Sequence, residues 1–206
     1  MIKKILAGMA AFGISTVLCA KSPENIKYFT KEAKFSECHF KITDPYSGTL
    51  TVYEDQGTAY YNVDINKKVR RPFETRMQFS CESATDEKTI SQLAGMKKTN
   101  RGWAIDQQSG YTKIKGAHTT FYSLKGKGWR GGGVSMDDIN GDEGQRNRVY
   151  TFCIIHQQVA LCGAVSRVAY LKHLNESVLP QVIKILNSIE FIDDLSVTTV
   201  SPVASL

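Results

Sequence analysis

The segment best suited to chemistry is a glycine-rich run, Lys125-Gly126-Lys127-Gly128-Trp129-Arg130-Gly131-Gly132-Gly133. Glycines let backbone amides approach a ligand closely, and Lys125, Lys127 and Arg130 add charge that attracts anions. The phosphate-binding spacing G-x-x-x-x-G-K-[ST] is absent. Two interpretations remain open: a flexible hairpin tip without a ligand, or a binding loop anchored by Trp129 and Arg130. In the second, Trp129 is exposed and contributes to an interface, where Trp and Arg dominate binding energy.

An acidic run follows, with Asp137, Asp138 and Asp142 around Asn140-Gly141. A calcium-binding EF-hand loop needs Gly at its sixth position and Glu at its twelfth, and neither position matches when counted from Asp138. A hairpin turn at Asn140-Gly141 explains the run more simply. We therefore place the three aspartates on the same candidate partner-binding surface as the cations and Trp129 of the preceding run.

Catalytic motifs do not occur in recognisable form. The nearest string to a nucleophile elbow, residues 133–137 around Ser135, lacks the second glycine of G-x-S-x-G. The four histidines, His39, His118, His156 and His173, are scattered along the chain. A catalytic triad is assembled in space, so a hydrolase stays an alternative. The prediction is a protein that is not an enzyme and has no cofactor.

Four cysteines follow the N-terminal leader: Cys38, Cys81, Cys153 and Cys162. In an exported chain an even number predicts two disulfides, in one of three pairings. A two-residue loop at 157–158 places Cys153 opposite Cys162 at a non-hydrogen-bonded pair, where Cα atoms approach most closely. This geometry favours Cys153–Cys162 and leaves Cys38 to pair with Cys81. The competing zinc site, from Cys153, His156 and Cys162, lacks a fourth ligand.

The first twenty residues have the features of a secretory signal peptide. Two lysines precede an apolar run from Ile5 to Leu18, which ends at Ala20. The run is shorter than the roughly 20 residues of a membrane-spanning helix, which favours cleavage near Ala20. Lipid attachment at Cys19 is the alternative, although Leu18 is bulkier than the small residue that normally precedes a lipidated cysteine. We predict an exported protein of the periplasm.

Charge and length set further limits on the function. The 206 residues carry 26 Lys+Arg and 20 Asp+Glu, and without Lys3 and Lys4 the balance is 24 minus 20, or +4. This mild, scattered basicity is not typical of nucleic-acid binding, and the sharper alternative is an anionic partner, such as an acidic protein or lipid headgroups. The predicted organisation is a leader over 1–20, a single domain over 21–192 and a flexible tail over 193–206.

The periodicity of apolar residues predicts the elements that position these side chains. Alternation predicts strands at 36–42, 50–52, 59–65, 77–81, 103–105, 111–115 and 119–124, then a hairpin over 149–165. Helical spacing predicts helices over 85–96, capped by Ser83 or Thr85, and over 178–188, with Ser177 as N-cap and Pro180 in the first turn. A short strand is expected at 190–192. The predicted fold class is α+β: an antiparallel β-sheet packed on one face by two main helices.

The C-terminal third combines a hairpin (149–165), an amphipathic helix (178–188) and a closing strand (190–192). This order resembles the C-terminal half of PsbP/Mog1-like domains. It also resembles the sheet-plus-helix domains of periplasmic immunity proteins, which neutralise effectors of bacterial type VI secretion. The resemblance implies a binding role and a Mog1/PsbP-like arrangement in this half of the chain.

These features predict an immunity-type inhibitor that inserts its 125–142 loops into the active cleft of a secreted effector or toxin. In this interpretation Trp129→Ala weakens the complex and leaves the fold intact. A membrane is contacted only through the cleaved leader, and nucleic acid is not a partner. The first alternative is a carrier of lipid or another small ligand, which requires an apolar hollow between the sheet and the terminal helix. The second is a hydrolase, which requires a nucleophile or acid to converge with a histidine.

Overall fold

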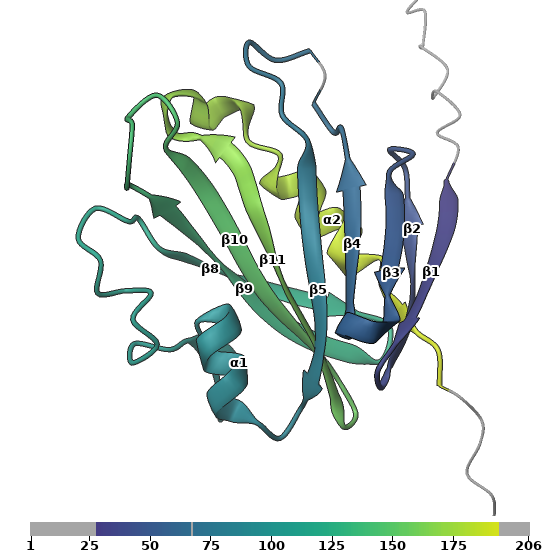
Figure 1. Cartoon of the computed structure of the whole chain (residues 1–206). Helices are drawn as coiled ribbons and strands as arrows, with labels where there is room; N and C mark the ends of the chain where they lie inside the picture. The colour runs from purple at the N-terminus through teal and green to yellow at the C-terminus, as the bar shows by residue number, and fades with distance from the viewer. Residues whose placement is uncertain (1–27, 67, 194–206) are drawn as a thin grey trace, which may run out of the picture.

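The computed structural model describes residues 28–66 and 68–193 (Figure 1). The predicted leader and the predicted tail beyond residue 193 lie outside the described residues. In chain order the elements are β1 (Phe29–Phe35), β2 (Cys38–Asp44), β3 (Thr49–Tyr53), η1 (Glu54–Gln56), β4 (Thr58–Val63), β5 (Thr75–Ser83), α1 (Glu87–Ala94), β6 (Met96–Thr99), β7 (Gly102–Ile105), β8 (Thr120–Gly126), β9 (Trp129–Asp138), β10 (Asn147–His156), β11 (Val159–Tyr170), η2 (Leu171–Glu176), α2 (Leu179–Asn187) and β12 (Glu190–Phe191).

Antiparallel sheets dominate the architecture, as the sequence predicts. The largest sheet has seven strands in the order β3-β4-β5-β11-β10-β9-β8. A three-stranded sheet has the order β1-β2-β12, and β6 pairs with β7 as a separate hairpin. Every strand pair is antiparallel. Sequence patterning found most of these strands but missed β1, β6 and β9.

The main core lies between the seven-stranded sheet on one side and α2 with the three-stranded sheet on the other. The alternating positions predicted to face inward do so: Phe40 in β2, Tyr61 in β4 and Phe79 in β5 are all fully buried. The rings of Phe40 and Phe79 lie 5.6 Å apart between centroids, which joins the two sheets through aromatic contact. Side chains therefore fill the space between the layers.

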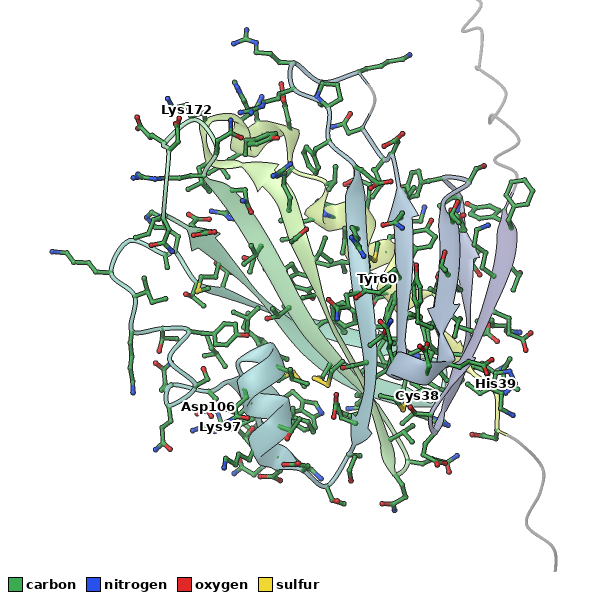
Figure 2. The ribbon with its side chains drawn as sticks, viewed as in Figure 1. Cys38, His39, Tyr60, Lys97, Asp106 and Lys172 are labelled. Atoms are coloured by element: carbon green, nitrogen blue, oxygen red, sulfur yellow. A yellow bond between two sulfur atoms is a disulfide. The ribbon has the colours of Figure 1, made fainter. Side chains whose placement is uncertain are left out.

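Both predicted disulfides are confirmed. Cys38 of β2 is bonded to Cys81 of β5, so this crosslink ties the smaller sheet to the larger one (Figure 2). Cys153 is bonded to Cys162, and the two residues are directly paired in the β10–β11 register, with the turn at 157–158. Because both thiols of Cys153 and Cys162 are consumed in a disulfide, the alternative zinc site is wrong.

The two helices lie on opposite faces of the seven-stranded sheet, which corrects the prediction that both cover one face. Figure 1 shows α1 in front of the strands and α2 behind them. Ile90 of α1 packs in a cluster with the Cys153–Cys162 pair, whereas Ile185 of α2 packs with Phe152 in the main core. Consecutive residues of a strand point to opposite faces, so β10 buries both of its faces here. Among the described residues, no helix is long and apolar enough to cross a membrane.

Two local expectations around α1 are also wrong. Asp86, not Ser83 or Thr85, is the N-cap, and its carboxylate accepts a hydrogen bond from the Thr89 amide at 3.0 Å. The strand expected at 111–115 is a series of turns, because Gly110 and Gly116 on either side adopt positive φ angles of 93° and 85°.

Strand β9 occupies most of the run that was interpreted as a flexible tip or binding loop. Its glycines are required by packing: a Cβ on Gly132 would collide with the ring of Phe121, and one on Gly133 would collide with the ring of Tyr150. Aromatic rings from neighbouring strands thus lie across a backbone that carries no side chains. The glycines make room for these rings within a strand that is paired on both sides.

Candidate functional site

A cleft lined by cations lies where the β6–β7 hairpin approaches the β8–β9 hairpin. Two adjoining hollows of about 670 and 490 Å³ share Trp103 and Arg130 in their walls. Arg101 and Lys125 line the larger hollow, and Lys98 lines the smaller one. No Asp or Glu is among the residues that line either hollow. We call these five residues the basic groove.

Strand register brings the two cations of the β8–β9 hairpin together. Lys125 is the direct cross-strand partner of Arg130, and both side chains are exposed. Like charges in directly opposed positions of an antiparallel pair destabilise a sheet. Repulsion between Lys125 and Arg130 therefore lowers the stability of the unbound protein, and an anion bound between the two side chains would remove this repulsion.

The β6–β7 hairpin supplies the opposite wall of the groove. Trp103 pairs with Lys98 in the register and is half-buried against the cluster that α1 forms with the Cys153–Cys162 pair. This packing holds the indole against the large sheet, so one side of the ring is anchored and another lines the groove. The hairpin carries Arg101 at its turn, next to β8. The groove therefore combines a fixed aromatic with cations on both walls.

The groove cations differ from nearby cations in their pairing. Lys97 lies 3.6 Å from Asp106, and Lys127 lies 3.8 Å from Glu190. In contrast, Lys98, Arg101, Lys125 and Arg130 have no ion pair within the described residues. Their uncompensated charge gives the groove a positive potential, and such a potential attracts anions.

Asp106 fixes the β6–β7 hairpin to α1. Figure 2 shows Asp106 and Lys97 side by side next to this helix. The Asp106 carboxylate accepts hydrogen bonds from the Ser91 hydroxyl of α1, at 2.5 Å, and from the Gln108 amide, at 3.0 Å. The bond from Ser91, then that from Gln108, and the charge of Lys97 hold the pKa of Asp106 below its ordinary value. The groove wall is thus connected to the sheet through α1.

Asp106→Asn should lower the free energy of unfolding at neutral pH by about 1 kcal/mol, because a charge-assisted hydrogen bond becomes a neutral one. A pKa that is lower in the folded state than in the unfolded state stabilises the protein above the unfolded value, near 4, and this contribution is lost as the pH falls. Urea unfolding across this range should therefore show a shallower acid loss for D106N than for the wild type. Asp55→Asn, at an exposed position of η1, is the control. Equal pH slopes for wild type and D106N would contradict this assignment.

Trp129 is not exposed, which corrects the expectation from sequence. Its side chain is 4% exposed, and the indole Nε1 donates a hydrogen bond to the Ile189 carbonyl oxygen at 2.7 Å. The ring lies against Gly126, where a Cβ would collide with it. Trp129 is therefore mainly a core residue that closes the sheet over the end of α2, and only its small exposed part lines the two hollows.

The predicted acidic residues lie at the other end of β9 from Arg130, so the structure does not bring them into the groove. Asp137 is buried, and Arg148 donates to it at 2.6 Å. This bond raises the pKa of Arg148. Asp138 and Asp142 accept hydrogen bonds from backbone amides two residues ahead, as turn-forming aspartates do. The three acids therefore organise the β9–β10 connection.

Of the seven residues proposed for partner binding, the structure places Lys125 and Arg130 in the groove, the largely buried Trp129 in its wall and Lys127 at the tip beside it. Sequence reasoning missed Lys98, Arg101 and Trp103. Their clustering in the 97–103 segment was a visible signal, but only the packing of the β6–β7 hairpin on the sheet brings that segment to Lys125.

His118 and His156 both lie beside carboxylates. His118 lies 2.9 Å from the Asp137 carboxylate, but Arg148 shares that carboxylate. His156 lies between the Gly128 carbonyl and Asp193. Within residues 28–66 and 68–193, no group of three or more His, Cys, Asp or Glu side chains is placed to hold a metal ion.

No protein-family model and no curated protein matches this chain.

Proposed function

We propose that this chain is an exported, periplasmic binding protein of the immunity type, which neutralises a secreted effector by binding an acidic segment of it. The observation that carries the proposal is the basic groove, where four cations without ion pairs surround one anchored Trp. An acidic protein surface is the partner that this charge and aromatic content fit best. Lys125 and Arg130, which the sequence already indicates as anion-binding residues, contact the partner.

Two further features support export and a binding role. Disulfides persist in oxidising compartments, and both crosslinks fit a protein that leaves the cytoplasm through a cleaved leader. The β10–β11 hairpin is followed by α2 and β12, the order of elements on which the likeness to PsbP/Mog1-like immunity domains is based. We include this family arrangement in the proposal.

The carrier alternative is less well supported. It requires an apolar hollow between the sheet and the terminal helix. Val182, Ile185 and Leu186 of α2 are almost completely buried, and they pack directly into the main core. Because side chains fill this region, a surface groove is the better candidate for the binding site.

The double reversal Arg101→Glu with Arg130→Glu should weaken partner binding by about 10- to 100-fold, because two attractive interactions become repulsive. The partner is first isolated by cross-linking in periplasmic extract of the producing cell and identified by mass spectrometry. Calorimetry with the purified pair then compares the wild type with the double variant. Lys115→Glu with Lys184→Glu, two exposed cations outside the groove, is the charge-matched control.

Two readouts decide the proposal. The wild type and the control pair should protect cells that express the partner, whereas the groove variant should not. Equal affinity of the groove variant and the wild type would reject the groove as the binding site. A partner without toxicity would reject the immunity role while leaving the groove in place.

A further inference from the structure

Within residues 28–66 and 68–193, one edge of β8 has no neighbouring strand, since β8 ends the order of the seven-stranded sheet. The backbone N–H of Lys125 donates to the side-chain oxygen of Asn187 at 3.3 Å, so this N–H points away from β9. Hydrogen-bonding direction alternates along a strand, and the backbone groups of Phe121 and Ser123 therefore point the same way as those of Lys125. Within the described part of the chain, no backbone group pairs with Phe121 or Ser123 on this side.

This free edge is also a wall of the basic groove. Residues 123–126 of β8 line the larger hollow together with Arg101 and Arg130. Backbone donors and acceptors thus lie beside unpaired positive charge. An exposed strand edge is a template for pairing with another chain, and natural proteins usually cover or shorten such edges. Here Asn187 covers one amide, and the neighbouring positions stay open.

We propose that the partner's acidic segment binds as an extended strand that adds to β8. This inference rests on the proposed function and specifies how the groove recognises its ligand. In strand addition, backbone hydrogen bonds supply affinity and alternate side chains supply specificity. At Lys125, a carbonyl of the incoming strand takes the place of the Asn187 side-chain oxygen.

The pleat of β8 defines the sequence of the incoming strand. Lys125 is paired with Arg130, and Ser123, two residues earlier, points to the same face of the sheet. Side chains of an added strand alternate in the same way. Every second residue of the partner segment then faces the groove cations and is Asp or Glu. The intervening residues of the partner segment face the side of the sheet where Leu124 and Trp129 are buried. These partner residues should therefore be apolar or small.

A pair of synthetic peptides of identical composition tests this pattern. In one peptide Glu alternates with Val or Thr, and in the other the same glutamates are contiguous. Fluorescence anisotropy should show the alternating peptide binding at least about 10-fold more tightly, because only it directs every carboxylate to the groove. Equal binding of the two peptides, or no binding of the alternating one at millimolar concentration, would overturn strand addition.

Variants of the edge test the backbone bonds directly. Ser123→Pro removes the backbone N–H that points away from β9 and keeps all four groove cations. Edge strands tolerate proline at such a position. Ser123→Pro should lower the affinity for the alternating peptide about 10-fold relative to Ser123→Ala, which removes the same hydroxyl and keeps the backbone N–H. Asn187→Ala should strengthen binding several-fold, because the competing side-chain oxygen is gone. Thermal unfolding verifies that each variant is folded.

A measurement on the peptide itself removes any dependence on the folding of the variants. N-methyl groups on the peptide amides that face β8 should abolish binding, and N-methyl groups on the other amides should not. If both methylated peptides bind alike and S123P matches S123A, strand addition is wrong. The proposed function fails separately, when the Arg101 and Arg130 reversal leaves partner affinity unchanged.

Discussion

Removing the Cys38–Cys81 disulfide should lower the free energy of unfolding by about 4 kcal/mol, the largest effect that we expect from any crosslink in this chain. The bond closes a segment with a sequence separation of 43 residues, and it joins β2 of the smaller sheet to β5 of the larger one. Without it, the unfolded chain gains the entropy of this loop. The smaller sheet then depends on side-chain packing and on the buried hydrogen bond from Tyr61 of β4 to Asp44 of β2 to stay docked.

The second disulfide is the matched comparison. Cys153 and Cys162 are separated by only 9 residues, so the same entropy argument gives about 2.5 kcal/mol for Cys153→Ala with Cys162→Ala. Guanidinium unfolding of the two double variants measures both values. Hydrogen exchange should show faster opening of β2 in the Cys38→Ala/Cys81→Ala variant. A larger loss for the short loop than for the long one would contradict the entropic interpretation.

Trp129→Ala should destabilise the protein by about 3–5 kcal/mol, as truncation of a buried aromatic residue does. The sequence interpretation expected weaker partner binding and an intact fold, but the side chain is only 4% exposed. Truncation leaves a cavity beside Gly126 and an unpaired carbonyl at Ile189. Thermal and chemical unfolding measure the loss directly.

Trp129→Phe separates the two contributions. It keeps an aromatic ring and removes the indole N–H, so the Ile189 carbonyl loses its donor, at a cost of about 1–3 kcal/mol. We expect the Phe variant, where it is folded, to bind the partner as the wild type does. If Trp129→Ala retained the stability of the wild type, this would contradict the placement of the Trp129 indole in the core.

Sequence periodicity predicted the parts of the fold in which one face of a strand is buried. Phe40, Tyr61 and Phe79 lie in alternating patterns, and their positions in the core follow from period two. The β10–β11 register followed from counting outward from a two-residue turn, which also placed Cys153 against Cys162. These inferences needed only local information.

The errors arose where burial depends on neighbours that are distant in sequence. The glycines of β9 resemble a loop until Phe121 and Tyr150 are known to lie over them. The placement of α1 on the second face had one signal, the continuous apolar run 152–155 in β10, which is typical of a strand buried on both faces.

The candidate site was predicted only in part for the same reason. Lys125 and Arg130 are close in sequence, and both were predicted, with Lys127, to attract anions. Arg101 and Trp103 reach them through the packing of a separate hairpin, held by Asp106 against α1. No local pattern encodes that approach. The acids at the far end of β9 were grouped with the cations because the run was interpreted as one loop.

Because the Lys125 and Arg130 side chains are directly opposed, ionic strength should have opposite effects on the stability of the unbound protein and on its affinity for an acidic ligand. Mobile ions shield the repulsion between the two cations, so added salt favours the unbound fold. In the proposed complex the same ions weaken the attraction for the acidic ligand, so added salt should disfavour binding. A lower salt concentration should therefore both destabilise the unbound protein and strengthen the proposed complex.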